Sequence, residues 1–145
     1  MSAEVLFQIA NPLALLGWIA LAGAPLAPRA ADLLAGWILP GALSLGYSVL
    51  ILLHWAEAPG GFGSLAEVQA LFTDPDLALA GWMHFLAFDL FVGAWIVRHA
   101  RAAGERHLVI LPILPFAFLF GPAGLMAYMA LRLVRRAGAA AGEVA

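Results

Sequence analysis

The sequence contains no cysteine and no lysine, and only 11% of its 145 residues are charged. Without cysteine, the chain can form neither a disulfide framework nor a thiolate metal site. So few charges could not cover the surface of a soluble domain of this size. A formal net charge of −2 offers no basic surface, so we expect no nucleic acid as a partner. Hydrophobic residues make up 64% of the chain, which predicts an integral membrane protein.

Four apolar runs are each long enough to cross a bilayer as a helix. They cover residues 5–26, 33–55, 77–97 and 108–134. These runs are about twice the length of a barrel strand, so they favour helices over a barrel. We predict an all-α fold, an integral membrane four-helix bundle that forms a single domain over residues 1–145.

The first run has a second interpretation, a cleavable signal peptide with small residues near Ala22 and Ala24. Signal peptides carry basic residues at their start, and the first four residues here contain none. An acidic start without arginine also disfavours a plastid transit peptide. We therefore expect a multi-pass protein of a bacterial inner membrane.

The longest connection, from Ala56 to Asp76, contains a helix signal. Ser64 and Glu67 form the capping-box pattern of a helix start, and apolar residues then recur at helical spacing. We predict a short amphipathic interfacial helix between the second and third spans, from Ser64 to Thr73. A loop helix packed on the end of the bundle is the alternative that the sequence leaves open.

The fourth run carries a proline near its middle, in the segment Phe120-Gly121-Pro122-Ala123-Gly124. Proline should kink this helix and leave a carbonyl near Phe118 without its usual partner. At membrane depth such a carbonyl needs protein or a cavity beside it. We therefore predict a kink at this segment.

Orientation depends on the arginines, since they are the only Lys or Arg residues present. Arg29, Arg98, Arg101 and Arg106 belong to the short connections, and Arg132, Arg135 and Arg136 to the side of both termini and the long loop. Four arginines on one side and three on the other decide little under the positive-inside rule. We place the short connections in the cytoplasm. We expect the basic connection, which also holds His99 and His107, to contact solvent and head groups.

The third run carries two ionisable side chains, His84 and Asp89, on either side of its midpoint. Such groups are costly in the bilayer interior and indicate a functional site by default. In a helix, five residues separate them by about 7.5 Å along the axis and about 140° around it. They cannot pair directly, but a ligand between helices could contact both. Desolvation favours the uncharged form of each, so Asp89 is a candidate catalytic acid and His84 a candidate base.

Structural roles are the alternative for both residues. Asp89 could cap freed backbone groups, and His84 could be a contact between helices. The aromatic rings around them would suit a long apolar or conjugated ligand. As residues that contact such a ligand we predict Trp82, Phe85, Phe88, Tyr47, Ser44, Asn11 and Tyr128. We expect neither a metal nor another cofactor, because no second ligand accompanies His84.

Several segments of the chain resemble the ABA4-like family, small four-helix membrane proteins named for the plant abscisic-acid-deficient 4 protein. The resemblance covers most of the chain and is strongest from Gly63 to Leu125. It is carried by Gly63-Ser64-Leu65, Ala80-Gly81-Trp82, His84, Leu86 to Gly93, and Phe120 to Leu125. One departure is Phe85, where the family often has tyrosine. A reaction that needs that hydroxyl is therefore not available to this chain.

The resemblance implies carotenoid chemistry, because the plant protein is associated with neoxanthin synthesis. In that conversion a ring epoxide of violaxanthin opens and a neighbouring vinylic proton leaves, which gives an allene. The reaction needs an acid and a base but no redox cofactor, and Asp89 and His84 match this need in type. The resemblance thus implies a membrane-embedded carotenoid (xanthophyll) isomerase.

A second hypothesis is a non-catalytic carotenoid-binding or accessory membrane protein of pigment metabolism. Coupled transport is weaker, because the sequence shows no inverted repeat. The expected partners are the lipid bilayer, a carotenoid or other long apolar ligand, and either a second copy of the chain or enzymes of the pigment pathway.

Overall fold

The computed structural model describes residues 2–142. Its elements are α1 (Ala3–Ala22), α2 (Pro28–Leu33), the π-helix η1 (Leu34–Ile38), α3 (Leu39–His54), the 3₁₀ turn η2 (Trp55–Glu57), α4 (Leu65–Leu71), α5 (Pro75–Ala102), α6 (His107–Ile110) and α7 (Ile113–Gly142). Every element in these residues is helical. Four segments are long and apolar enough to cross a membrane, namely Ala3–Ala22, Pro28–Glu57, Pro75–Ala102 and Ile113–Gly138. The predicted all-α class with four such helices is confirmed, and the chain is a multi-pass membrane protein.

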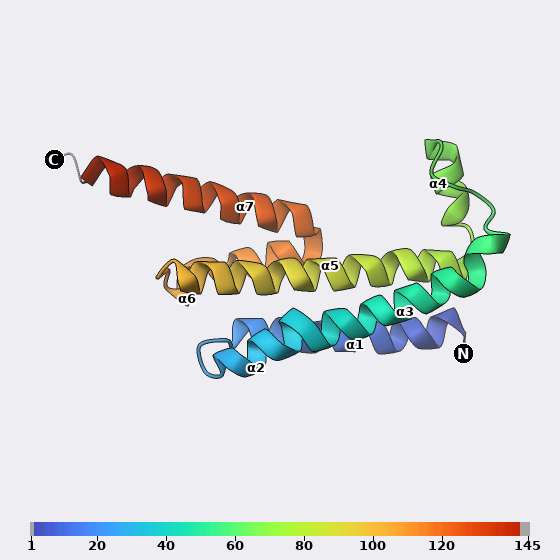
Figure 1. Cartoon of the computed structure of the whole chain (residues 1–145), viewed down its shortest axis with the longest axis horizontal. Helices are drawn as coiled ribbons and strands as arrows, with labels where there is room; N and C mark the ends of the chain where they lie inside the picture. The colour runs from blue at the N-terminus through green and yellow to red at the C-terminus, as the bar shows by residue number, and fades with distance from the viewer. Residues whose placement is uncertain (1, 143–145) are drawn as a thin grey trace.

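The central element of the bundle is α5. Within its most apolar window 56% of the residues are buried, against 28% in each of the other three segments. The helices α1 and α3 lie along one side of α5, and α7 lies along the other (Figure 1). Glycines allow close approach between α1 and α5, because a Cβ at Gly17 would overlap Leu90 and one at Gly93 would overlap Trp18. Such close packing holds helices together in lipid, where no hydrophobic force acts between them.

The second membrane segment stays helical although Pro40 lies within it. Proline has no N–H and crowds the preceding turn of a helix. The five residues of η1, in the wider π conformation, directly precede the turn that contains Pro40. Within η1, Gly36 packs so closely on α5 that a Cβ would overlap the guanidinium of Arg98. The irregular turn therefore lies against a basic side chain of the central helix.

The short helix predicted between the second and third spans is present as α4. The Ser64 hydroxyl accepts a hydrogen bond from the N–H of Glu67 at 3.2 Å. In return, the Glu67 carboxylate accepts one from the N–H of Gly63 at 3.0 Å. Figure 1 shows α4 standing away from the long helices at one end of the molecule. That α4 lies on a membrane surface remains a prediction.

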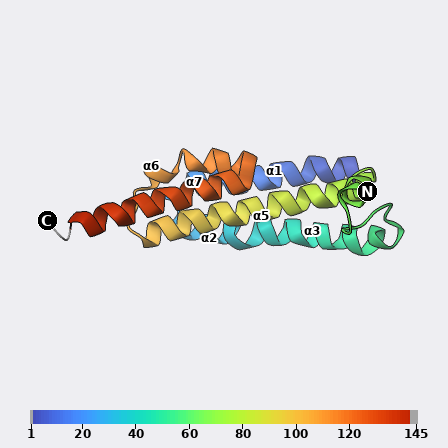
Figure 2. The same ribbon diagram turned by 90° about the horizontal axis from the view of Figure 1, so that it is seen from above.

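The backbone of α7 reverses its direction at Phe120. This residue has φ −143° and ψ 51°, outside the helical range. Figures 1 and 2 show an outgoing arm (residues 113–119) and a return arm (residues 121–142) that lie side by side. The arms are so close that a Cβ at Gly124 would overlap the backbone of Ala117. The predicted kink is confirmed, and it is sharp enough to make α7 a helical hairpin.

The return arm ends beside the connection between α5 and α6. Arg132 Nη1 lies 2.9 Å from Glu105 Oε1, and Arg135 Nη2 lies 4.0 Å from Glu105 Oε2. The start of α1 and the end of α7 therefore lie at opposite ends of the molecule (Figure 1). The expectation that both termini share one side is wrong, because the reversal at Phe120 returns the last arm to its starting side.

Candidate functional site

Asp89 lies halfway along α5 and faces the turn of the α7 hairpin. Its side chain is 8% exposed. The carboxylate packs against the backbone of Gly121, whose N–H is directed at it, and a Cβ at Gly121 would overlap it. Within the described residues Oδ2 of Asp89 has no hydrogen-bond partner. The hairpin turn and this carboxylate thus form one polar site at the centre of the molecule.

This arrangement gives Asp89 a structural role at the start of the return arm. The first N–H groups of a helix have no acceptor in their own helix, and they form the positive end of its dipole. Pro122 removes one of these donors, a frequent use of proline in the first helical turn. Asp89 supplies a negatively polarised acceptor for Gly121 from the neighbouring helix. Capping of freed backbone groups is the alternative that the sequence left open for this residue.

An apolar groove lies between α1 and α5 on the half of the molecule that contains the start of α1, and the turn of the α7 hairpin borders its inner end. Its inner part is a cavity of about 410 Å³. The residues that line it are Asn11, Pro12, Leu15, Trp82, Phe85, Leu86, Phe118 and Leu119. Trp82 Nε1 donates a hydrogen bond to Asn11 Oδ1 at 2.8 Å, and the Trp82 ring stacks on Phe85 at 5.5 Å. Phe118 and Leu119 belong to the hairpin, so its turn closes this cavity at mid-depth.

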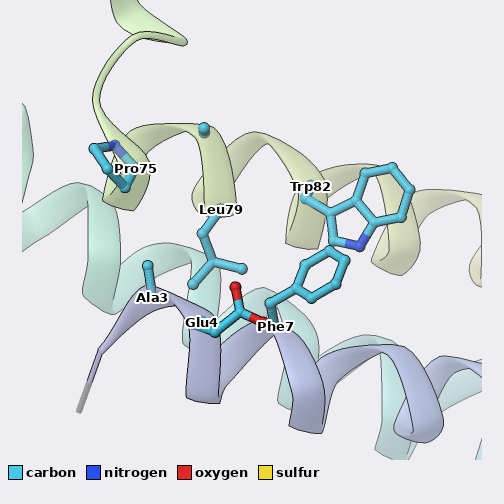
Figure 3. Close-up of a pocket in the computed structure, with 7 residues that line it drawn as sticks. Ala3, Glu4, Phe7, Pro75, Leu79 and Trp82 are labelled. Atoms are coloured by element: carbon cyan, nitrogen blue, oxygen red, sulfur yellow. The ribbon is translucent and has the colours of Figure 1, made fainter.

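The outer part of the same groove opens near the start of α1 and of α5 (Figure 3). This cavity of about 370 Å³ is also lined by Trp82, which therefore lies between the outer and the inner part. Figure 3 shows the carboxylate of Glu4 between Leu79 and Phe7, among otherwise apolar walls. We call the two cavities together the α1–α5 groove. It has a polar outer end, aromatic walls and a closed inner end.

A second groove lies between α3 and α5. One cavity of about 310 Å³ is lined by Ser44 and Phe88 among others, and one of about 210 Å³ by Tyr47 and His84. The His84 ring stacks on Phe88 with 4.6 Å between centroids and lies 5.7 Å from the ring of Tyr47. We call these cavities the α3–α5 groove. It is open toward lipid, since both His84 and Phe88 are exposed.

The structure divides the predicted site residues among three places. Asn11, Trp82 and Phe85 line the α1–α5 groove, with Asp89 beyond its closed end. Ser44, Tyr47, His84 and Phe88 line the α3–α5 groove. Tyr128 lines neither groove. His84 and Asp89 face different helices, α3 and α7, so the structure does not bring the proposed base and acid together.

Tyr128 is fully buried between the return arm and α5. Its hydroxyl lies 2.6 Å from Nδ1 of His99, whose ring stacks on Trp95 at 5.0 Å. This contact ties the return arm to the central helix. The sequence missed this role of His99, which we expected to contact solvent. Trp95 and His99 are one turn apart, and that spacing was the signal that they share a face.

Other members of the basic connection also bond within the protein rather than to solvent alone. Arg101 pairs with Asp32 of α2, and His107 Nε2 lies 3.0 Å from the carbonyl oxygen of Ala22. Arg98 is half-buried against η1. The expectation that these residues contact only solvent and head groups is therefore wrong for these three. They join the ends of α1, α2 and α5.

Among residues 2–142, no group of three or more histidine, aspartate or glutamate side chains lies close enough together to hold a metal ion. The polar groups that the two grooves offer are single carboxylates, hydroxyls, an amide and one imidazole. Such groups can form hydrogen bonds and exchange protons with a ligand.

Comparison with known proteins gives one family match. Residues 5–128 match the family described as ABA DEFICIENT 4-like, or ABA4-like. This range includes most of α1, the elements α2 to α6, the hairpin turn and every groove residue except Ala3 and Glu4, and it ends at Tyr128. No curated protein and no solved structure matches the chain.

Proposed function

This chain belongs to the ABA4-like family, and we propose that it binds a carotenoid in the α1–α5 groove as a membrane protein of the carotenoid or abscisic-acid pathway. Family membership suggests the pathway. The observation that supports the ligand is the shape and lining of the groove. Its two cavities follow one another along α1 and have mainly apolar and aromatic linings, which suits a rigid polyene.

The dimensions of the groove agree with half the depth of a bilayer. Along α1 it extends from Ala3 to Leu15, about 18 Å at the rise of an α-helix, and half a hydrocarbon core is about 15 Å. Aromatic rings line this length and can pack on a conjugated chain. They are Phe7, Trp82, Phe85 and Phe118. Because Asn11 and Trp82 bond to each other, they present no unpaired polar group to such a chain.

A carotenoid as long as the bilayer is thick would occupy the groove with one half and continue with the other half over the exposed side chains of Leu119 and Phe120 at the hairpin turn. Its outer ring would lie near Glu4, whose carboxylate can accept a hydrogen bond from a ring hydroxyl. The middle of the polyene would lie near Asp89. In this pose Asp89 keeps its capping role, and the protein binds the pigment without changing it.

Co-purification from a carotenoid-producing host tests this proposal. The purified protein should retain pigment in a fixed ratio to the chain, measured by absorbance and by extraction. Trp82→Ala removes the ring shared by both cavities and should lower that ratio. Trp37→Ala, which removes an exposed ring from the α3–α5 groove, should not. Loss of pigment from Trp37→Ala alone would move the site to the α3–α5 groove.

Catalysis is a second candidate, favoured by the unpartnered Oδ2 of Asp89. Catalysis needs a pose in which an epoxidised ring, rather than the middle of the polyene, lies at the hairpin turn. The Asp89 carboxyl then gives its proton to the epoxide oxygen while the ring C–O bond breaks. The neighbouring vinylic carbon loses its proton to the other carboxyl oxygen, and the electron pair of that C–H bond forms the new double bond. The carboxyl group is regenerated, so the step needs no co-reactant.

Product analysis in membranes supplied with an epoxy-xanthophyll tests the catalytic role. Asp89→Asn keeps an acceptor for Gly121 but has no acidic proton, so the rate should fall by about 10²–10⁴-fold while pigment stays bound. His84→Gln distinguishes the two proton routes. A single-carboxyl reaction predicts an unchanged rate, whereas a similar loss would restore His84 as the base. Normal product from Asp89→Asn would end the catalytic role of Asp89.

A further inference from the structure

All seven arginines of the chain lie at one end of the molecule, in or beside α2, the end of α5 and the end of the return arm. Arg29 is in α2, and Arg98, Arg101 and Arg106 are at or just after the end of α5. Arg132 and Arg135 contact Glu105 in the connection after α5, and Arg136 follows them. The hairpin produces this gathering, because a fourth straight crossing would carry the last three arginines to the opposite end. We call this surface the arginine end.

The arginine end has few acidic groups to neutralise it. In the described part of the chain these are Asp32, paired with Arg101, and Glu105, paired with Arg132 and Arg135. Arg29, Arg106 and Arg136 are exposed, and no carboxylate of residues 2–142 lies within 4.0 Å of them. Several guanidinium groups are therefore free to bind anions outside the protein.

The opposite end of the molecule has the reverse charge. It contains Glu4, Glu57, Glu67, Asp74 and Asp76, and the described residues place no arginine there. The chain thus has opposite charge at its two ends. From the sequence alone we assigned four arginines to one side and three to the other. The structure places all seven at one end and none at the opposite end.

We propose that the arginine end binds the anionic head groups of the cytoplasmic leaflet, and that the start of α1 lies on the other side of the membrane. Arginine-rich segments next to spanning helices remain in the cytoplasm, and the anionic lipids of that leaflet attract each such residue. The planar guanidinium also matches a phosphate in bidentate geometry. The distribution of charge therefore sets both the orientation and the lipid preference.

Cysteine labelling tests the orientation, and the natural chain provides a cysteine-free background. Single cysteines replace three exposed alanines, Ala66 in α4, Ala102 at the end of α5 and Ala137 in the return arm. A membrane-impermeant maleimide should label Ala66→Cys in intact spheroplasts, and the other two only after permeabilisation. Labelling of Ala137→Cys from the same side as Ala66→Cys would overturn the proposal, as would exposure of Ala102→Cys in intact spheroplasts.

Thermal unfolding in neutral detergent tests the lipid preference. Phosphatidylglycerol should raise the unfolding midpoint by roughly 3 °C or more, while phosphatidylcholine and inorganic phosphate should not. The triple variant Arg29→Gln, Arg106→Gln, Arg136→Gln should lose most of this shift. The matched control Glu4→Gln, Glu57→Gln, at the opposite end, should keep it. An equal shift with phosphatidylcholine, an equal shift with inorganic phosphate, or a full shift in the triple variant would overturn the proposal.

Discussion

Asp89 and Gly121 depend on each other at the contact between α5 and the hairpin turn. A helix start at membrane depth leaves N–H groups without acceptors, and a buried carboxylate without donors is equally costly. Together the two residues offset both costs. Glycine is needed at 121 because the carboxylate occupies the space where a Cβ would be.

Replacing Asp89 tests whether stability depends on the acceptor that its side chain offers to the N–H of Gly121. Asp89→Leu removes the acceptor and leaves the N–H of Gly121 unpaired, so the free energy of unfolding should fall by about 1–3 kcal/mol. Asp89→Asn keeps a carbonyl oxygen and should stay close to the parent. Thermal loss of helical circular dichroism in detergent measures both. A leucine variant as stable as the parent would contradict the capping role.

Gly121→Ala tests the same contact from the side of the hairpin. The added methyl group would overlap the Asp89 carboxylate, and overpacking of this kind costs about 1–3 kcal/mol. Gly138→Ala is the matched control, because a Cβ there has nothing within 4 Å. The control should be neutral or slightly stabilising, since alanine favours helix over glycine. Equal stability of the two variants would exclude the close approach at Gly121.

At this scale the sequence identified Asp89 but not its partner. An acidic residue in the middle of a long apolar run is visible without a structure, because its cost there is independent of context. Gly121 lies far along the chain, and only the direction of the hairpin brings it to Asp89. The same limit applies to His99, whose hydroxyl partner Tyr128 lies on another element.

The hairpin of α7 is held by contacts along its return arm as well as by its turn. Tyr128 contacts His99 near the middle of the arm, and Arg132 pairs with Glu105 closer to the end of the chain. Both partners are part of α5 or follow it directly. These contacts hold the arm against α5 and the connection that follows it.

Releasing the return arm should loosen that element alone. The double variant Tyr128→Phe, Arg132→Gln removes both polar contacts, so amide hydrogen exchange should rise in residues 121–138 and not in α1 or α3. Tyr47→Phe is the control, because no hydrogen bond of the Tyr47 hydroxyl occurs in the described residues. Uniform acceleration across the chain would show that these contacts stabilise the whole bundle instead.

At the scale of elements, the sequence predicted helix type and the position of the break. Apolar runs, the capping box at Ser64 and the proline near the middle of the last run all act locally. The angle of the break is not local. It depends on the close contact of Gly124 with Ala117 and on partners in α5, which the sequence pattern does not encode.

As a whole, the molecule has two unlike halves. On the arginine end, α7 covers α1 and α5, and on the acidic end the α1–α5 groove is open. If both proposals hold, one half of a carotenoid lies in the groove within the leaflet opposite the cytoplasm, and its other half continues past the hairpin turn. The sequence predicted the membrane class and the apolar segments, but it assigned the last arm to the wrong side, which also hid the gathering of arginines.

Occupation of the α1–α5 groove is tested most directly by filling it. Leu15 lines the inner cavity, whereas its neighbour Leu16, which is similarly exposed, lines neither groove. Bound pigment per chain is measured after purification from a carotenoid-producing host. Leu15→Trp should reduce it roughly tenfold or more, because tryptophan occupies the ligand's space, and Leu16→Trp should leave it unchanged. Equal pigment in the two variants, with both folded, would show that the carotenoid does not bind in this groove.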